Sequence, residues 1–143
     1  MNRAFEECLK KRKIIPFPRA KRFALKELTA AAEDLAEARD RFVHRRYKYA
    51  TINAYYAVFH AARALLYSRG YREKSHHCLA LALEALFVDP GSLAGRYVRM
   101  FQNTMASRED ADYSGSFSKE NASLCIQDAE DFLRAATKLL RQA

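Results

Sequence analysis

The chain has 143 residues and a formal net charge of +8, from 25 Lys and Arg against 17 Asp and Glu. This length fits one domain, and a composition of 50% hydrophobic and 29% charged residues excludes an intrinsically disordered chain. Only four Gly and three Pro argue against a turn-rich β-sandwich and favour long, uninterrupted helices.

The N-terminal residues 1–18 are expected to form a basic arm that leads into a helical domain over residues 19–143. Residues 1–22 hold eight basic and two acidic side chains, a charge of +6, whereas the remainder holds 17 basic and 15 acidic side chains, or +2. The closely spaced Pro16 and Pro18 prevent a continuous helix there. The pattern leaves open whether the arm is ordered.

Five helical segments are predicted. In the first, from Arg19 to about Arg46, apolar residues recur at spacings of three and four, and no Gly or Pro intervenes. The second, from Tyr49 to Ser68, is apolar nearly all round, so we expect it at the centre of the domain. Gly70 follows it and fits a left-handed C-cap.

Three further helices follow. Ser75 is expected to cap the third, and residues 89–91 (Asp-Pro-Gly) to end it. Ser92 is expected to cap the fourth, and Ser118 the last, with a polar connection at residues 108–117 between them. With no convincing strand and with short connections, the pattern predicts an all-α fold, an up-and-down antiparallel bundle of four to five helices.

A polar strip crosses the second helix, formed by Asn53, His60 and Arg63. At roughly 100° per residue these side chains fall within about 80° of one another. They either satisfy buried neighbours, with Arg63 paired to an acid on another helix, or form a functional surface. Both interpretations stay open at this point.

The start of the third helix is a second candidate. Lys74 and the helix N-terminus are suited to receive an anion such as a phosphate, although a solvated loop capped by Ser75 is the simpler alternative. His76 and His77 would point about 100° apart on a helix, and no carboxylate has a matching spacing. We therefore expect no metal and no cofactor.

A third candidate is the stretch from Arg108 to Tyr113. Arg108 and Asp112 are four residues apart and would form a salt bridge if the chain is helical there. Elsewhere the sequence contains no P-loop, no G-x-G-x-x-G fingerprint, no H-E-x-x-H and no sign of a Ser-His-Asp triad.

The three cysteines, Cys8, Cys78 and Cys125, are widely spaced and form no C-x-x-C motif. We expect free thiols, which suit a reducing compartment and predict a cytoplasmic protein. No apolar run approaches the roughly 18 residues of a membrane span, and no apolar stretch follows the N-terminal basic residues as in a signal peptide. We expect no membrane contact.

Three strings occur in a fixed order: Tyr55 to Ala62 (YYAVFHAA), Lys74 to His76, and Arg108 to Tyr113 (REDADY) before a long final helix. In this order they resemble the HEPN family, most closely its short stand-alone prokaryotic proteins, over roughly residues 20–140. The resemblance implies a helical bundle that often dimerises. It also implies a partner, because many members act as toxin and antitoxin with a minimal nucleotidyltransferase.

Many HEPN proteins are metal-independent ribonucleases with an Arg-x4-His motif, in which Arg acts on the phosphate and His on the reacting oxygens. Here Arg108 matches the Arg, but Tyr113 stands at the position of the His, with Asp112 before it. Neither side chain replaces a neutral imidazole near pH 7.

The Arg-x4-His spacing also occurs from Arg39 to His44 and from Arg72 to His77, in the wrong part of the family's order. A bundle that brought His60, His76 and Arg108 together would assemble a site from different helices.

Three functions are therefore weighed. The first is an interaction module, a homodimer that works with a partner such as a nucleotidyltransferase and has no ribonuclease His. The second is a metal-independent ribonuclease or RNA-binding toxin, and the third a nucleotide-binding helper that holds phosphates through Arg63, Lys74 and Arg108. The candidate polar site comprises Asn53, His60, Arg63, Lys74, His76, Arg108, Asp112 and Tyr113.

Overall fold

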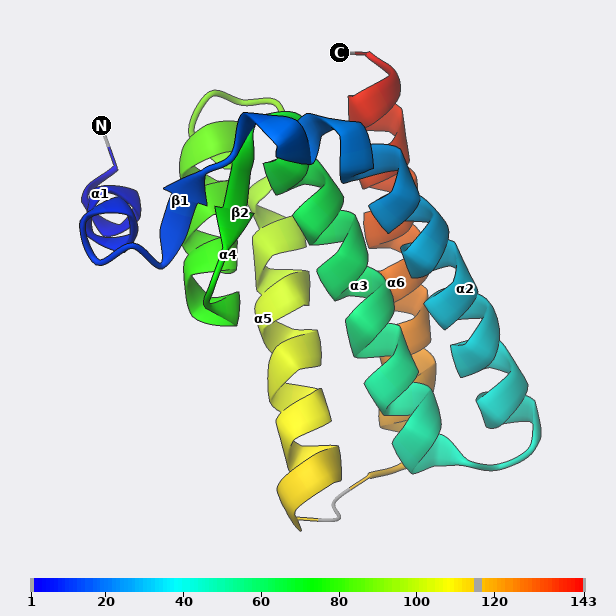
Figure 1. The fold of residues 1–143 in the computed structure, drawn as a ribbon. Helices are drawn as coiled ribbons and strands as arrows, with labels where there is room; N and C mark the ends of the chain where they lie inside the picture. The colour runs from blue at the N-terminus through cyan, green and yellow to red at the C-terminus, as the bar shows by residue number, and fades with distance from the viewer. Residues whose placement is uncertain (1, 115–116, 143) are drawn as a thin grey trace.

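A computed structural model describes residues 2–114 and 117–142, which form a helical bundle with one small pair of strands (Figure 1). In chain order its elements are α1 (Arg3–Lys10), β1 (Ile14–Pro16), a 3-10 helix (Pro18–Phe23), α2 (Ala24–Val43), α3 (Tyr47–Ser68), β2 (Tyr71–Glu73), α4 (His76–Leu83), a π-helical turn (Glu84–Val88), α5 (Gly95–Glu109), a second π-helical turn (Asp110–Ser114) and α6 (Lys119–Arg141). The predicted all-α bundle is confirmed. Helices α2 to α6 correspond to the five predicted segments, and α1 lies in the arm.

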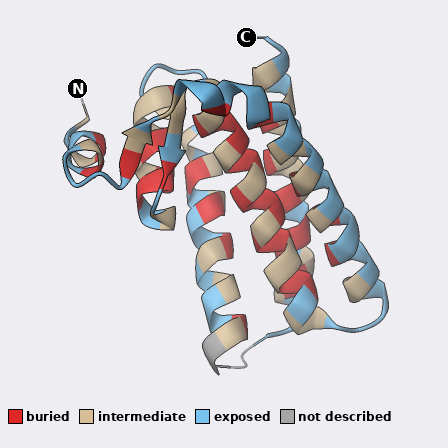
Figure 2. Ribbon diagram, in the orientation of Figure 1, coloured by how far each residue is buried: buried red, intermediate tan, exposed pale blue. Residues whose placement is uncertain are grey.

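Helix α3 is the centre of the bundle, as its apolar surface predicts. It packs against α2, α5 and α6, and its buried residues lie on several sides of the helix (Figure 2). Many of them are alanines, such as Ala54, Ala57 and Ala61, which are fully buried. Small side chains let neighbouring helices approach closely, so the packing leaves room for the aromatic rings of Tyr55 and Phe59 in the same core.

The helix ends mostly follow the sequence signals. Ser75 Oγ accepts a hydrogen bond from the backbone N–H of Cys78, and Ser118 Oγ accepts one from Asn121. Gly70 follows α3 with a φ of +76°, which places it in the left-handed region that glycine favours. The cap predicted at Ser92 is wrong: α5 starts at Gly95, and the backbone N–H of Ser92 donates to the carbonyl of Phe87 in the turn after α4.

The polar connection predicted at residues 108–117 is also wrong for its first part. Helix α5 continues to Glu109, and a π-helical turn carries the chain to Ser114. Two features hold this stretch helical: Ala111 is fully buried, and Arg108 Nε lies 2.8 Å from Asp112 Oδ2. The predicted i, i+4 salt bridge is therefore present, and the helix around it is longer than its polar sequence indicates.

The two strands were not predicted. β1 pairs antiparallel with β2, with Ile14 opposite Glu73 and Pro16 opposite Tyr71 (Figure 1). Ile14 is fully buried, and its burial holds β1 against the bundle. The strand was missed because it is too short for its sequence to show an alternating pattern. Pro16 sits at the end of an edge strand, where its missing N–H costs no ladder hydrogen bond.

The expectation of three free thiols is wrong for two of them. Cys8 of α1 and Cys78 of α4 form a disulfide with their Cα atoms 5.9 Å apart, although 70 positions separate them in sequence. Pairing of β1 with β2 brings α1 against α4, which places both cysteines within disulfide reach. Cys125 is free and buried, and burial raises the pKa of its thiol.

Within residues 2–18, the N-terminal arm is thus folded against α4 and β2. No helix in the described part of the chain is both long and apolar enough to cross a lipid bilayer.

Candidate functional site

The polar strip of α3 faces α2 and meets acidic side chains there. His60 Nδ1 lies 2.5 Å from Glu27 Oε2, and His60 Nε2 lies 3.5 Å from Asp34 Oδ2. Asn53 donates a hydrogen bond of 3.2 Å to the other oxygen of Asp34. Both carboxylates come from α2, seven residues apart, and so match the spacing of Asn53 and His60 on the antiparallel α3.

Arg63 completes this network at its end near β2. Its guanidinium donates to both oxygens of Glu73, with Nη2 2.7 Å from Oε2, and Nη1 lies 3.4 Å from Glu27 Oε1. The Glu73 side chain is only 5% exposed. Each charge here has an opposite partner, which is the condition under which proteins bury charge.

Electrostatics act in opposite directions on two acids of this network: they favour the ionised form of Glu27, whereas burial raises the pKa of Asp34. Burial by itself would raise the pKa of Glu27, but the hydrogen bond with His60 and the charge of Arg63 outweigh it and hold that pKa below its usual value. We name the six residues the carboxylate network: Glu27, Asp34, Asn53, His60, Arg63 and Glu73. Its groups are occupied by one another, so the geometry fits the structural interpretation of the strip.

A second cluster joins α3, α4 and the end of α5. The Tyr55 hydroxyl lies 2.5 Å from His76 Nδ1. The Arg108 guanidinium lies 5.7 Å from the ring centres of both Tyr55 and Tyr56 and donates a hydrogen bond to the Tyr56 hydroxyl. With Asp112, which pairs with Arg108, we name these five residues the Arg108 cluster.

The Arg108 cluster is open to solvent on one side. Tyr55 is fully buried, whereas His76, Tyr56, Arg108 and Asp112 are half-buried. Burial lowers the pKa of His76 below its usual 6.5, and the charges of Arg108 and Arg63 lower it further, against the opposing effect of Glu73. Burial also raises the pKa of the Tyr55 hydroxyl well above its usual value. Near pH 7 the pair is therefore a neutral phenol beside a neutral imidazole.

The lowered pKa of His76 predicts a pH-dependent stability. Between the pKa of the folded state and 6.5, the unfolded chain binds the proton and the folded chain does not, so stability falls as pH falls from about 7. Urea unfolding at pH 5 to 8 is expected to show this loss in the natural chain and a smaller one in His76→Gln. The exposed neighbour His77 provides the control, and the assignment fails if His77→Gln flattens the pH profile as much.

The structure brings only part of the hypothesised His60, His76 and Arg108 site together. His76 and Arg108 both contact Tyr55, but His60 belongs to the carboxylate network. The Phe59 ring stands between the two imidazoles, with its centre 5.5 Å from His60 and 4.4 Å from His76.

The remaining candidates lie apart from the Arg108 cluster or cannot be placed. Lys74 is exposed just beyond β2. The backbone of Tyr113 is in the second π-helical turn, and its side chain lies outside the described part of the structure. In the Arg-x4-His string on α2, Arg39 pairs with Glu130 of α6, and His44 pairs within its own helix.

Sequence reasoning missed the partners of the candidate residues. Glu27, Asp34 and Glu73 carry the ion pairs, and Tyr55 connects His76 to Arg108. The acids had a usable signal, because their spacing of seven on α2 matches the polar strip of α3. Glu73 had none, since it reaches Arg63 only because β2 turns back along α3.

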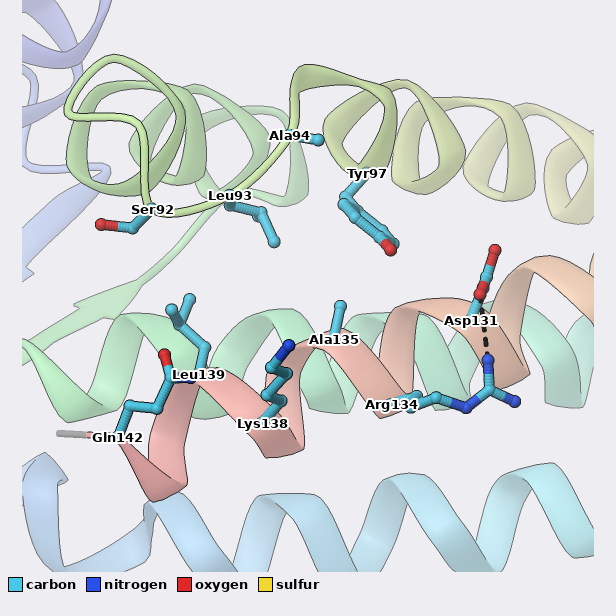
Figure 3. Close-up of a pocket in the computed structure, with 10 residues that line it drawn as sticks. All are labelled: Ser92, Leu93, Ala94, Tyr97, Asp131, Arg134, Ala135, Lys138, Leu139 and Gln142. Carbon is cyan, nitrogen blue, oxygen red and sulfur yellow. Dashed lines mark hydrogen bonds and ion pairs between the residues drawn. The ribbon is translucent and has the colours of Figure 1, made fainter.

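A cavity of about 380 Å³ lies between the loop before α5 and the C-terminal half of α6 (Figure 3). An ion pair of Asp131 with Arg134 stands at one end of it. No residue of the carboxylate network or the Arg108 cluster lines this cavity. Among the described residues, no three His, Cys, Asp or Glu side chains are placed to hold a metal ion.

The fold and these clusters define a small all-α domain in which one Arg-Tyr-His cluster reaches the surface between three helices. The family model of the HEPN domain matches residues 25–140, and the chain belongs to the HEPN family.

Two relatives share most of this domain. The chain is 32% identical over 113 residues to a Methanocaldococcus jannaschii protein named "Putative toxin", covering 78% of this chain and 84% of the relative. It is 30% identical over 112 residues to a Thermotoga maritima protein named "UPF0332 protein", covering 77% of this chain and 85% of that protein. The family match starts at residue 25, so α1, β1 and the 3-10 helix precede it.

Proposed function

We propose that this chain is a toxin-type HEPN interaction module that works with a partner protein such as a minimal nucleotidyltransferase. The observation that carries this proposal is that Arg108 is already paired and has no His at the position of the ribonuclease motif. Its guanidinium is paired with Asp112, and Tyr113 occupies the position where the ribonuclease motif has its His. The toxin name of the relative from Methanocaldococcus jannaschii supports the same assignment.

The test is to express the chain alone and together with the nucleotidyltransferase encoded nearest to it. We expect induction of the chain alone to arrest growth of a bacterial host, and co-expression to restore growth and to give a complex that survives gel filtration. Normal growth together with the absence of a complex would overturn the proposal. Arg108→Ala is expected to keep the complex.

We further propose that the module is a homodimer. Its apolar dimer face would lie where the C-terminal end of α2 meets the N-terminal part of α6. Val43 is 75% exposed and Leu124 57% exposed, and each lines a shallow groove together with Phe42. Side chains of both charge signs, such as Arg39 and Glu130, border this face, which suits a two-fold interface in which one surface meets itself.

The dimer face makes a specific prediction. Val43→Glu and Leu124→Glu place a charge in the apolar centre and are each expected to shift the chain to a monomer, as measured by sedimentation velocity. Leu25→Glu is the matched control, because Leu25 is 72% exposed at the other end of α2. An unchanged sedimentation coefficient in both test variants, or an equal shift in the control, would contradict this face.

A second candidate function is metal-independent RNA cleavage with His76 in place of the missing His. It is favoured by the contact of His76 and Arg108 with the same ring, Tyr55, and by the neutral imidazole that the lowered pKa of His76 provides. For His76 Nε2 to accept a proton from a 2′-hydroxyl, Nδ1 must carry the hydrogen and donate it to the Tyr55 oxygen. Arg108 would then stabilise the phosphate after releasing Asp112.

Cleavage of a labelled RNA in the presence of EDTA tests this candidate. His76→Gln and Arg108→Ala are expected to reduce the rate by about 10²- to 10⁴-fold each, and His77→Gln to leave it unchanged. Cleavage that survives the His76 substitution would exclude the role of this imidazole.

The nucleotide-binding alternative has less support. Arg63 is held by Glu73 and Glu27, and Lys74 lies on the outer side of the sheet, so the three proposed cations do not share one cluster. A cytoplasmic location stays a prediction, and the Cys8–Cys78 disulfide removes its thiol argument.

A further inference from the structure

The segment that precedes the HEPN match is a folded addition to the bundle. Its helix α1 buries Phe5 and Cys8, its strand β1 buries Ile14, and the Cys8–Cys78 disulfide ties it to α4. This segment also contains most of the net charge of the chain. The basic residues of the arm are thus held at fixed positions on the surface.

The strand pair sorts its side chains onto two faces. Ile14 and Glu73 are opposite each other and both buried, so they form the inner face. Side chains alternate along a strand, and therefore Lys13, Arg72 and Lys74 share the outer face, where all three are exposed. The backbone N–H of Lys74 donates to the carbonyl of Lys13 at 2.8 Å, which sets these two residues directly across from each other.

The 3-10 helix extends this outer face. The backbone N–H of Phe17 donates to the carbonyl of Gly70, and the side chain of Lys21 reaches the same glycine. Seven cations, namely Lys13 and those of the 3-10 helix and of the turn around β2, are exposed. We name them the basic surface: Lys13, Arg19, Lys21, Arg22, Arg69, Arg72 and Lys74.

The cations of the basic surface have no carboxylate partners in the described part of the chain. Residues 11–22 contain no Asp or Glu, and Glu73, the acid among residues 69–74, faces inward to Arg63. In the described part of the chain, none of the seven cations forms an ion pair with a carboxylate. The seven cations are thus exposed without a carboxylate partner, and a bound polyanion would supply the missing negative charge.

Aromatic rings accompany these cations. Arg72 lies over the ring of Phe17, 5.6 Å from its centre, and Phe23, which ends the 3-10 helix, is 43% exposed. A polyanionic protein segment would use only the charges, whereas a single nucleic acid strand uses both features, because its phosphates bind the cations and its unpaired bases stack on exposed rings.

We propose that the basic surface binds the phosphate backbone of single-stranded nucleic acid, with Phe23 as a stacking platform for a base. Four of its cations precede the residues of the family match and three lie within them, and the surface shares no residue with the Arg108 cluster. It therefore does not depend on whether that cluster cleaves RNA or whether the chain has a partner.

The test is fluorescence anisotropy of the full chain with labelled 20-nucleotide oligomers across a range of salt concentrations. The variant Lys13→Gln, Arg72→Gln, Lys74→Gln is expected to weaken binding at least tenfold and to reduce the slope of log Kd against log salt by about two. The matched control, Arg99→Gln, Lys119→Gln, Lys138→Gln, removes one Arg and two Lys from exposed positions on α5 and α6. It is expected to cost less than threefold.

The stacking role of Phe23 is tested with a second variant and its matched control. Phe23→Ala is expected to weaken binding about tenfold with an unchanged salt slope, and Phe117→Ala, which removes a ring that is 49% exposed in another part of the chain, to have no effect. RNA and DNA oligomers of one sequence identify the natural strand. Equal losses in the test and control triples, tighter binding of duplex DNA of the same length, or equal competition by polyglutamate would each overturn the proposal.

Discussion

Replacing Arg63 with methionine is expected to lower the free energy of unfolding by about 3–5 kcal/mol, because it leaves the buried carboxylate of Glu73 without its partner. Glu73 is 5% exposed at its side chain and receives three guanidinium contacts in the natural chain. Methionine fills a similar volume, so the loss reports the unpaired charge and not a cavity. Urea unfolding at pH 7 measures it.

Two controls make this result specific. Arg134→Met removes a cation that is 72% exposed and paired with Asp131 on the same helix, and its expected cost is below about 1 kcal/mol. The double variant Arg63→Met, Glu73→Gln removes both charges and is expected to recover much of the loss. A cost near that of Arg134→Met, or a double variant less stable than Arg63→Met alone, would mean that the pair is not a buried ion pair.

Opening the Cys8–Cys78 disulfide is expected to cost about 4 kcal/mol, because the bridge closes a chain segment of 70 residues and restricts the unfolded state. For a chain of this size the loss corresponds to a melting temperature lower by roughly 10 °C. The variant Cys8→Ala, Cys78→Ala should melt at the same temperature with and without dithiothreitol, close to that of the reduced natural chain.

Thiol titration gives the direct control for this prediction. The natural chain, denatured without reductant, should show one reactive thiol, from Cys125, and three after reduction. Three thiols in the unreduced sample would show that the bridge is absent. The buried Cys125 contributes equally to both melting curves, so its alkylation state does not enter the comparison.

Local signals predicted much of the fold. The apolar surface of residues 49–68 identified the central helix, and the caps at Ser75, Ser118 and Gly70 all lie where short-range chemistry places them. These features depend on residues within one helical turn. The cap predicted at Ser92 is wrong because the backbone N–H of Ser92 donates to the carbonyl of Phe87. That contact depends on the π-helical turn after α4 and not on the residue type.

Only part of the candidate functional site could be predicted from the sequence. Arg63, His60 and Asn53 were identified as polar residues of a buried helix, and the salt bridge of Arg108 with Asp112 followed from their spacing. Their long-range partners did not, because the approach of α2 to α3 and the reversal of β2 decide which acid meets which cation. The Cys8–Cys78 bridge was missed for the same reason. The spacing of two cysteines in the sequence does not show whether residues 70 positions apart lie in contact.

The antiparallel pairing of β1 with β2 also sets an order of events during synthesis. β1 leaves the ribosome long before Tyr71–Glu73, so it has no strand to join until the whole α2–α3 hairpin has been made. The contact is non-local, and such contacts form late because closing the intervening loop costs entropy first. The N-terminal segment therefore docks only after α2, α3 and β2 have been made, and Cys8 meets its disulfide partner only once α4 has followed.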